Sequence, residues 1–469
     1  MRNLHYEKFT DGSVKCIEDE IPFELPEGWE WCNLSMIGQT NIGLTYKPSD
    51  KSLTGTMVLR SSNIVNGKID LTDLVRVGCE IRDNQYALEN DILICARNGS
   101  KSLVGKCAII GNMNERASFG AFMAIYRTPY YRYVYHFLNS DFFREVFADG
   151  NSTAINQLTQ DMIKKARIPF PPLMEQIRIA DVVDKYLALI DEITEQSKEC
   201  GQLVQNAKNH ILDLAIRGKL VPQNPDDEPA SVLLERIRAE KEELIKQGKI
   251  KRDKRESVIF RGEDNSYYEK VRNEFICIED DLPFDIPDGW AWCELQDCCF
   301  KEIKRGRSPK YADAGKVLSF AQKCNQKSGD INICLAQWID DSSIGRYDED
   351  EYMLDGDIVI NSTGTGTLGR VGIYHDSVNR ERTPIVPDSH VTVVRTSSLF
   401  NSSYIFLCLK ALQSRLEELG EGSTNQKELK PLTIQQQRIP VPPLVEQQAI
   451  VKRVFAFFEE LDCVEANLC

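Results

Sequence analysis

The sequence lacks the residue patterns from which metal centres and small catalytic sites are built. Its 15 cysteines form no C-x-x-C pair, and its five histidines are scattered singly. A structural zinc site is therefore not expected, and such thiols are typical of a reduced, cytoplasmic protein. No acid–base pair or nucleophile constellation stands out, so we expect no catalytic, cofactor-binding or metal-binding residues in this chain.

Long apolar runs are also missing. The N-terminal residues MRNLHYEKFTDG contain no apolar segment of the kind found in secretory signals. One of the longest apolar stretches, YIFLCLKAL at 404–412, contains a lysine and falls short of the roughly 20 residues of a membrane span. The 469 residues, 42% hydrophobic and 27% charged, instead predict a soluble protein of two or three domains.

The net charge of -14 is unusual for a protein that binds nucleic acid, but its distribution leaves room for such binding. Residues 1–34 carry a net charge of -5 and residues 263–297 a net charge of -9. Residues 60–132 hold ten bases and seven acids, and residues 301–346 hold nine and five. The two acidic segments alternate with mildly basic ones, which limits DNA contact to the basic regions.

A long internal repeat organises the chain. CIEDEIPFELPEGWEWCNL at 16–34 and CIEDDLPFDIPDGWAWCEL at 277–295 are identical at 12 of 19 positions, with an offset of 261. A second match pairs RIPFPPLMEQ at 167–176 with RIPVPPLVEQ at 438–447, and a weaker one pairs DILI at 91–94 with DIVI at 357–360. This period is too long for a solenoid and predicts a duplicated domain.

The interiors of the two copies differ, because residues 35–90 and 296–356 show no convincing similarity. A common frame that holds two different reading surfaces accounts for conserved borders and divergent interiors. Drift without a functional role is the alternative. Trp29, Trp31, Trp290 and Trp292 lie in the shared acidic segments, so we expect them to anchor the domain core or a partner rather than stack on bases.

Each copy is followed by a coiled-coil pattern with strict 4-3 spacing. Its positions are Ile179, Val183, Tyr186, Ile190, Ile193, Val204, Ile211 and Leu214 after the first copy, with Ser197, Cys200 and Ala207 between, and Ile450, Val454, Phe457, Leu461, Val464 and Leu468 after the second. We expect the two helices to pair antiparallel. The second seam ends with the sequence at Cys469, which indicates a short distal helix or a truncated chain. Either case leaves 200–214 without an obvious partner helix in the same chain, and the candidates to cover it are the helix expected at 231–247 or a partner subunit.

Several segments resemble motifs of cofactor-binding, phosphate-binding or methyltransferase sites, but their spacing or their neighbouring residues do not fit. GTGTLG at 364–369 fits a dinucleotide-binding loop, but RVGIYH follows it and predicts a strand instead of a helix. NGSKSLVGK at 98–106 has the wrong glycine spacing for a phosphate loop, and FPPL at 170–173 lacks the Asn or Asp of an amino-methyltransferase motif. The basic run KIKRDKR at 249–255 is either a charged linker or a contact to the DNA backbone.

These features together resemble the specificity subunit of type I restriction–modification enzymes. The resemblance rests on LPEGWEW and IPDGWAW, on the two PPL-x-EQ motifs and on LAIRGKLVPQNPDDEPASVLLERIRAEKEEL at 214–244. NDILICARNGSKSLVGKCAII at 90–110 and GDIVINSTGTGTLGRVGIY at 356–374 each resemble a target-recognition domain type of that family. The resemblance covers essentially the whole chain.

The resemblance implies an α/β (α+β) fold with two mixed α/β target-recognition domains in a pseudo-two-fold arrangement, separated by an antiparallel coiled coil of long helices. It implies that each domain reads one half of a bipartite site in double-stranded DNA, and that the helices set the spacer. Two methyltransferase subunits and the restriction and translocase subunits are the implied partners, and S-adenosylmethionine, ATP and magnesium belong to those partners. The implied parts are an N-terminal arm (1–22), target-recognition domain 1 (23–170), a central helical region (171–257), a linker (258–283), target-recognition domain 2 (284–440) and a distal helix (441–469).

Candidate DNA contacts follow from the donors and acceptors that match base edges. The candidates, all in basic and turn-rich parts of the two copies, are Arg60, Ser62, Asn63, Arg97, Asn98, Lys101, Lys106, Lys323, Asn325, Gln326, Lys327, Arg346 and Arg370. Two alternatives remain open. The first is that the chain is a protein-interaction scaffold without a DNA role, and the second is that it is an inactive orphan copy of a specificity subunit.

Overall fold

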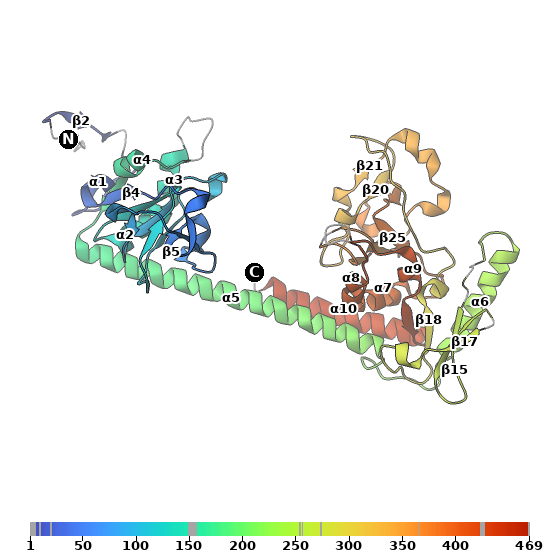
Figure 1. Ribbon diagram of the computed structural model, residues 1–469. Coiled ribbons are helices and arrows are strands. Elements are labelled where there is room, and N and C mark those ends of the chain that lie inside the picture. The colour runs from blue at the N-terminus through green and yellow to red at the C-terminus, as the bar shows by residue number, and fades with distance from the viewer. Residues whose placement is uncertain are drawn as a thin grey trace. The chain divides into compact units, whose positions relative to one another are not determined.

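The computed structural model describes residues 6–8, 11–18, 21–148, 157–252, 255, 257–272, 274–364, 366–422 and 427–467. The chain divides into two compact units, Met1–Thr194 and Glu195–Cys469. The boundary lies inside the 44-residue helix α5, Leu173–Ile216 (Figure 1). Each unit mixes helices and strands, in agreement with the predicted fold class.

The first unit is built on two four-stranded sheets with the orders β11-β10-β13-β4 and β8-β5-β12-β9. Smaller pairs join β1 to β2, β3 to β14 and β6 to β7. The strands are β1 Tyr6–Lys8, β2 Val14–Cys16, β3 Glu30–Asn33, β4 Gln39–Ile42, β5 Lys51–Leu59, β6 Ile64–Val65, β7 Lys68–Ile69, β8 Val75–Val77, β9 Tyr86–Ala87, β10 Ile92–Cys95, β11 Cys107–Ile109, β12 Ala117–Phe119, β13 Met123–Arg127 and β14 Arg167–Phe170. The helices before α5 are α1 Leu34–Ile37, α2 Tyr131–Asn139, α3 Asp141–Ala148 and α4 Gln160–Lys165.

The second unit contains a four-stranded sheet, β19-β25-β22-β23, and a three-stranded sheet, β21-β20-β24. A further sheet, β15-β16-β17, and the pair β18-β26 complete its described strands. The strands are β15 Ser257–Arg261, β16 Tyr267–Val271, β17 Glu274–Cys277, β18 Ala291–Glu294, β19 Lys304–Arg305, β20 Leu318–Phe320, β21 Gln337–Trp338, β22 Ile358–Asn361, β23 Val371–Ile373, β24 Ile385–Pro387, β25 Val391–Val394 and β26 Arg438–Val441. The helices are α6 Ala230–Lys246, α7 Ser402–Ala411, α8 Gln413–Glu418, α9 Pro431–Gln435 and α10 Leu444–Ala466.

The sheets of the two units have the same topology. Read backwards, β23-β22-β25-β19 matches β11-β10-β13-β4, and β21-β20-β24 matches β8-β5-β12. In the sheets β8-β5-β12-β9 and β21-β20-β24 one parallel pair, β5 with β12 and β20 with β24, lies among antiparallel neighbours. The duplication therefore includes the interiors in which the amino-acid letters no longer match.

A glycine at the same place in each copy keeps the two sheets close together. A Cβ atom on Gly43 would collide with the carbonyl oxygen of Gly120, and one on Gly306 with the carbonyl oxygen of Pro387. Both glycines directly follow an edge strand, β4 of the sheet β11-β10-β13-β4 or β19 of the sheet β19-β25-β22-β23. We attribute the glycine at both positions to this approach of two backbones.

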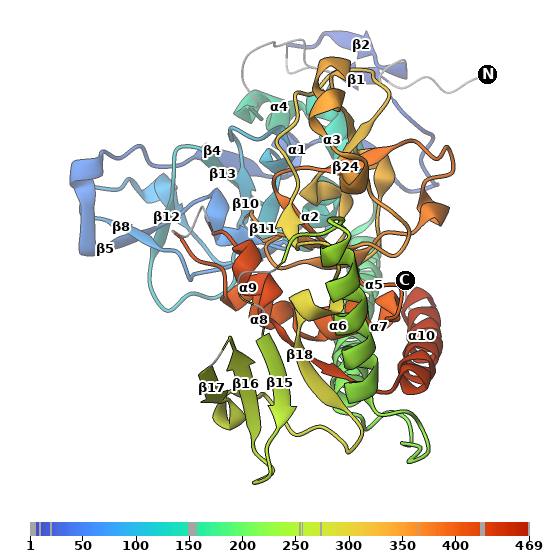
Figure 2. The ribbon, with the colours of Figure 1, turned by 90° about the vertical axis from the view of Figure 1, so that its right-hand side faces the viewer.

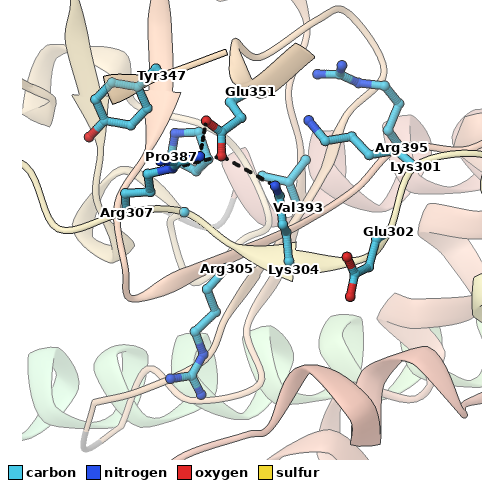
Figure 3. A pocket seen from close by; sticks show the side chains of 11 residues that line it. Lys301, Glu302, Lys304, Arg305, Arg307, Tyr347, Glu351, Pro387, Val393 and Arg395 are labelled. Carbon is cyan, nitrogen blue, oxygen red and sulfur yellow. Dashed lines mark hydrogen bonds and ion pairs between the residues drawn. The ribbon is translucent and has the colours of Figure 1, made fainter. Parts of the chain in front are cut away.

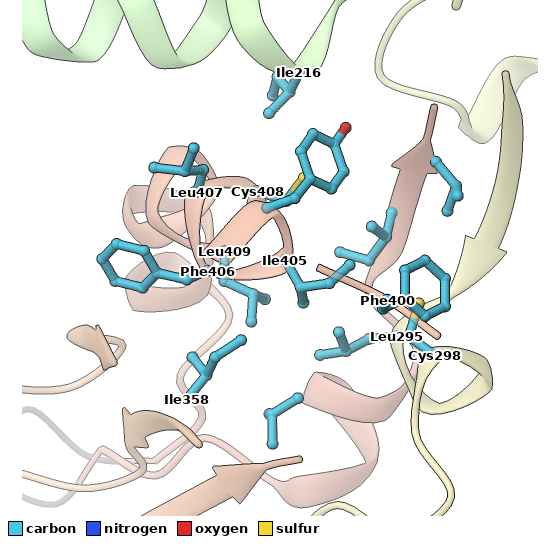
Figure 4. Close-up of a cluster of buried hydrophobic side chains, with 14 of the residues drawn as sticks. Ile216, Leu295, Cys298, Ile358, Phe400, Ile405, Phe406, Leu407, Cys408 and Leu409 are labelled. Atoms are coloured by element: carbon cyan, nitrogen blue, oxygen red, sulfur yellow. The ribbon is translucent and has the colours of Figure 1, made fainter. Parts of the chain in front are cut away.

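The core of the second unit surrounds α7, whose residues 404–409 are all buried (Figure 4). This is the segment YIFLCLKAL, and its burial on all sides explains why it is apolar around the whole helix. Ile405, Leu407 and Leu409 are each 0% exposed, and each contributes about 1.5–3 kcal/mol by leaving water. Among the described residues, no helix is both long and apolar enough to cross a membrane.

The PPL-x-EQ motifs start α5 and α10 in the same way. The indole N–H of Trp29 donates to Glu175 (3.1 Å), and that of Trp290 donates to Glu446 (2.9 Å). The glutamine that follows each glutamate donates its side-chain N–H to a proline carbonyl, 2.7 Å in the first copy and 3.0 Å in the second. The paired tryptophans of 29–31 and 290–292 therefore anchor the domains, as the sequence analysis predicts.

The Glu446 carboxyl provides a pH-dependent test of this arrangement. Burial raises its pKa above the ordinary value of 4.5, although Gln223 and Trp290 donate hydrogen bonds to it. A carboxyl whose pKa is raised by folding stabilises the folded state at low pH, and that stability is lost as the pH rises through its folded pKa. We expect urea denaturation to show the free energy of unfolding of the wild type falling, relative to Glu446→Gln, as the pH rises above 4.5. A constant difference between pH 4 and 7 (about the titration range) would contradict this expectation.

The predicted seam forms two helices that pair in the second unit. Leu212, Ala215 and Ile216 of α5 pack with Ile450 and Val454 of α10. Lys208 forms ion pairs with Asp462 and Glu465, further along α10. Higher residue numbers on α5 thus meet lower ones on α10, which confirms the antiparallel direction.

The prediction that 200–214 lacks a partner helix is wrong. Val204 is 5% exposed, and Ile211 and Leu214 are half-buried, because antiparallel packing sets the beginning of α10 against the end of α5. The exposed part of the seam lies earlier, at Tyr186, Ile190 and Ile193. The remaining described positions of the seam are half-buried at Ile179, Val183, Phe457 and Leu461 and exposed at Val464. Leu468 lies outside the described residues.

Two expected domain limits differ from the structure. The expected linker, 258–283, contains most of the sheet β15-β16-β17, so it is folded (Figure 2). The helices expected as a separate central region contribute to the core of the second unit, because Leu233, Leu234 and Ile237 of α6 belong to the same buried cluster as Trp290.

Candidate nucleic-acid interface

Three loops meet at one end of the sheets in each unit. We call them the end loops: residues 60–63, 96–106 and 120–122 in the first unit, and 322–325, 362–364 with 366–370, and 388–390 in the second. Equivalent backbone hydrogen bonds hold both sets. The matched bonds, each from an N–H to a carbonyl oxygen, are Gly120 to Leu59 (2.9 Å) and Asp388 to Phe320 (3.0 Å), Ala96 to Phe122 (2.9 Å) and Ser362 to His390 (2.8 Å), and Gly105 to Cys95 (2.9 Å) and Gly369 to Asn361 (2.8 Å).

The glycine-rich stretches form the middle end loop of each unit. Gly105 and Gly369 have φ angles of 85° and 73°, which glycine adopts without strain. The strands β11 and β23 follow them directly, so the prediction of a strand after GTGTLG is confirmed. Among the described residues, no cluster of three His, Cys, Asp or Glu side chains could hold a metal ion.

Asn63 and Asn325 are wrong as predicted base contacts, because both are 0% exposed. The Asn63 side-chain amide donates to the carbonyl oxygens of Asp70 (2.9 Å) and Asp73 (2.8 Å). The Asn325 amide donates to the carbonyl oxygen of Arg370 (3.0 Å). Both amides hold the first end loop in place, and buried amides committed in this way do not reach a groove of DNA.

The other candidates of the first unit lie on its end loops or next to them. Arg97 is exposed and its guanidinium carbon lies 5.4 Å from the centre of the Phe122 ring. Asn98 donates to the Ser61 hydroxyl (3.3 Å), which joins two of the loops. Ser62 and Lys101 are exposed, whereas Lys106 is half-buried. Arg60 is half-buried and pairs with Asp73 (2.7 Å).

In the second unit the structure brings only part of the predicted set together. Lys323 and Lys327 are exposed, and Gln326 donates its side-chain amide to the Lys323 carbonyl (2.8 Å). Arg370 donates to the carbonyl oxygens of Asn325 (2.8 Å) and Gly366 (3.3 Å), so it stabilises the end loops from within.

Arg346 does not belong to this group. It ends the short helix Asp341–Arg346, whose Ile344 packs on the cluster that contains Val317. Val317 precedes β20, whereas the end loops follow that strand. Arg346 is exposed, but at the opposite end of the strand from the loops.

Three further residues of the end loops, Phe122, Thr363 and His390, are not among the contacts predicted from the sequence. Phe122 is 60% exposed beside Arg97, and its ring is available for stacking. In the second unit the hydroxyl of Thr363 lies 2.7 Å from Nδ1 of His390. A signal was present for two of them, because Phe122 and His390 follow the strands β12 and β24 at matching positions, three residues after Phe119 and Pro387.

A basic pocket adjoins the end loops of the second unit (Figure 3). It is lined by Lys301, Glu302, Lys304, Arg305, Gly306, Arg307, Tyr347, Glu351, Pro387, Val393 and Arg395. Pro387 leads directly into the loop 388–390. The segment Asn41–Leu44 of the first unit matches Lys304–Arg307 of this pocket and carries no charge. The two copies therefore differ in charge at this place.

Glu351 organises the cations of this pocket. Its carboxylate lies 2.9 Å from Nη2 of Arg307 and 3.4 Å from Nζ of Lys304, as the dashed lines in Figure 3 mark. Burial alone would raise the pKa of Glu351, but the backbone N–H of Asp348 and the Arg307 guanidinium hold it below the ordinary value. The carboxylate is therefore ionised at neutral pH and fixes both cationic side chains.

Two cations of the basic run 249–255 lie near carboxylates. Arg252 pairs with Glu242 (2.6 Å), and Arg255 lies 3.9 Å from Glu294. Residues 253 and 254 lie outside the described part of the chain. Lys249 and Lys251 are exposed, so the choice between a charged linker and a contact to the DNA backbone stays open for this run.

Known proteins share both the sequence and the fold. The family described as "Type I restriction modification DNA specificity domain" matches residues 26–200 and 287–467. The EcoEI specificity subunit of Escherichia coli is 24% identical over 519 residues, which cover 97% of this chain and 82% of that protein. The StySPI specificity subunit of Salmonella potsdam is 32% identical over 207 residues, which cover 42% and 44% of the two chains.

A solved structure that concerns complex assembly and conformational transition of the type I R-M system contains a chain of similar fold. It covers 95% of this chain and 96% of its own length, with a TM-score of 0.59 and 17% identity. The two family matches coincide with the duplicated sheets and the helix that follows each of them. The chain therefore belongs to the type I restriction modification DNA specificity family.

Proposed function

We propose that this chain is the DNA-recognition subunit of a type I restriction–modification complex, in which each duplicated domain reads one half of a bipartite site. The observation that carries the proposal is that two sets of end loops share one backbone frame and present different side chains. A shared frame holds both readers in the same geometry, and different side chains give the half-sites different sequences.

The first reader uses Arg97, Asn98 and Lys101, with Phe122 as an apolar contact. Arg and Asn offer paired donors and acceptors to base edges in the major groove, and an aromatic ring adds contact with a thymine methyl group. The second reader uses Lys323, Thr363 and His390. Because His390 bonds to Thr363, this pair presents a fixed pattern of donors and acceptors to a base edge.

The basic pocket of the second unit supplies backbone contacts to the same reader. Lys304 and Arg307 lie beside Pro387, which leads into the loop 388–390. Phosphate contacts of this kind position a protein on DNA without reading its sequence. The matching segment of the first unit, Asn41–Leu44, carries no charge. We therefore expect the affinity of the two units for their half-sites to depend differently on salt concentration.

Catalysis in the complex is carried out by the subunits that bind this chain. Two methyltransferase subunits dock on the helices of this chain, and restriction and translocase subunits join them. S-adenosylmethionine, ATP and magnesium bind those partners, and this chain contributes selection of the site alone. The antiparallel helices α5 and α10 stiffen the connection and set the gap between half-sites; at ~1.5 Å per residue α5 is about 66 Å long.

An exchange of one domain interior tests this function. Replacing residues 35–160 with the same region of a relative is expected to change one half of the methylated sequence and to leave the other half unchanged. The measurement is the methylation pattern of genomic DNA in cells that express the chimaera with its methyltransferase subunit. A change in both halves, or in neither despite a soluble chimaera, would refute the modular assignment.

A further inference from the structure

Thr363 and His390 form one side-chain pair on the end loops of the second unit. The Thr363 hydroxyl oxygen lies 2.7 Å from Nδ1 of the His390 ring. The backbone of His390 is bonded on both sides as well. Its N–H donates to the Asp388 carboxylate (2.7 Å), and its carbonyl oxygen accepts from the Ser362 N–H (2.8 Å). The exposed imidazole is therefore held in one direction by its own backbone and by the hydroxyl beside it.

The same two positions contact each other in the first unit, with different chemistry. The matched backbone bonds of the end loops place Phe122 at the position of His390. They place Arg97 at the position of Thr363. There the Arg97 guanidinium carbon lies 5.4 Å from the centre of the Phe122 ring. The two copies thus differ in chemistry at a pair of positions that their common backbone presents in the same way.

The contact with Thr363 determines which nitrogen of the His390 ring carries hydrogen. A neutral imidazole has one N–H, and its other nitrogen is an acceptor. Within the described part of the chain, the Thr363 hydroxyl has no second partner, so donation to Nδ1 is the arrangement that uses its hydrogen. The ring hydrogen then lies on Nε2, which is the donor that remains for a ligand. Protonation of the ring would also leave an N–H at Nε2.

Lys323 provides a second donor at the same loop. The Asp388 N–H donates to the Phe320 carbonyl oxygen (3.0 Å), so the loop 388–390 lies beside the loop that contains Lys323. Burial raises the pKa of the Asp388 carboxyl, and the hydrogen bond from His390 and the nearby His390 and Lys323 side chains oppose this rise. Both side chains therefore lie around one buried carboxyl. Lys323 is exposed, and its ammonium group can only donate.

Two neighbouring donors match one base in the major groove. Guanine presents two acceptors there, N7 and O6. Adenine presents the acceptor N7 beside an amino donor, thymine presents one acceptor beside a methyl group, and cytosine presents an amino donor. Guanine is therefore the base that gives each of the two donors an acceptor.

We propose that the second unit reads a guanine, to which His390 donates from Nε2 to N7 and Lys323 donates from its ammonium group to O6. Thr363 is the positioning residue that fixes the histidine. This inference rests on the proposed function and deepens it, because it names a base that one half-site contains and the residues that select it.

A guanine that lacks N7 tests the contact. The recognised site is first obtained from genomic methylation, and the half read by the second unit is the one that the exchange of residues 35–160 leaves unchanged. Each guanine of that half is then replaced by 7-deazaguanine, which keeps its base pairing, and the duplexes are bound by the complex with its methyltransferase subunit. At one position we expect the affinity of the wild type to fall about tenfold, and His390→Ala to bind both duplexes equally.

Variants of Thr363 separate positioning from contact. Thr363→Val removes the hydroxyl and keeps the branched shape, so it is expected to reduce the ratio of about tenfold between the two duplexes, whereas Thr363→Ser should keep it. His375→Ala is the matched control. The His375 ring also bonds through Nδ1, 3.3 Å from Asp355, but it follows β23, whereas the end loop 366–370 precedes that strand. His375→Ala should keep the full ratio.

Lys323→Met tests the second donor. It is expected to reduce the preference for guanine over adenine at the same position about tenfold, while the sensitivity to 7-deazaguanine remains. The proposal is overturned if this half of the site contains no guanine, if no 7-deazaguanine lowers the affinity, or if His390→Ala keeps the full ratio. Discrimination by the wild type that does not depend on N7 would refute the guanine contact alone. Loss of discrimination in both halves would refute the proposed function as well.

Discussion

Replacing Asp357 with asparagine is expected to reduce the stability of the second unit by about 3 kcal/mol, near the lower end of what the loss of a buried ion-pair partner costs. The Asp357 carboxylate is 1% exposed and accepts two hydrogen bonds from Arg395, at 2.7 and 2.6 Å, and one from the Leu354 N–H at 2.8 Å. The asparagine amide removes the negative charge that pairs with the Arg395 guanidinium, which is 21% exposed and keeps its hydrogen bonds to the carbonyl oxygens of Asp350 and Tyr352.

The first unit contains a matched pair that is expected to respond less. Asp91 is also 1% exposed and accepts two hydrogen bonds from Arg127, both at 2.7 Å. Arg127 is 36% exposed, so water compensates more of its charge once the carboxylate is gone. We expect Asp91→Asn to cost about 2 kcal/mol.

Hydrogen exchange followed by mass spectrometry measures the two effects separately. In Asp357→Asn, amides of β22 should exchange about 100-fold faster, which corresponds to about 3 kcal/mol, whereas those of β10 should keep their wild-type rates. Asp91→Asn should reverse this pattern with a smaller factor. Unchanged exchange in β22, or a larger effect from Asp91→Asn, would contradict the account of the buried pair.

The borders of the repeat and the helices could be predicted from sequence because both depend on local patterns. The 19-residue match places Trp29 and Trp290 in the same contact with the glutamate of the following motif, and 4-3 spacing defines α5 and α10. The pairing of these helices was misjudged at one point. Matching the seams position by position left 200–214 without a partner, whereas an antiparallel pair aligns the end of α5 with the beginning of α10.

The interior of each domain could not be predicted, because burial was retained there while residue identity was lost. Met57–Leu59 and Leu318–Phe320 form equivalent strands, and their residues differ at all aligned positions. The asparagines at 63 and 325 lie 262 residues apart, one more than the offset of the repeat. That spacing was a signal of a common structural role, but their polarity in a basic segment suggested DNA contact. Only the tertiary structure shows that both amides are consumed by backbone carbonyls.

Arg97→Ala is expected to weaken binding to the specific DNA site by about 1–3 kcal/mol and to relax discrimination at one base pair of one half-site. Arg97 is an exposed cation of the first reader, and Phe122 beside it limits its orientations. The measurement is a set of dissociation constants for duplexes in which each base pair of the site is varied in turn, with the complex assembled on its methyltransferase subunit.

Arg116→Ala is the matched control. Arg116 is also exposed and lies over an aromatic ring, 3.7 Å from the centre of Tyr86, but it precedes β12 whereas the end loop 120–122 follows that strand. Both variants remove one positive charge from the same unit, so a purely electrostatic effect would weaken all duplexes alike and change the salt dependence similarly. A base contact by Arg97 instead predicts that only Arg97→Ala changes the ranking of the varied duplexes, and that the half-site read by the second unit keeps its full discrimination. If Arg97→Ala weakens every duplex by the same factor, Arg97 binds phosphate, and the base-reading surface of the first unit must then lie on Asn98 and Lys101.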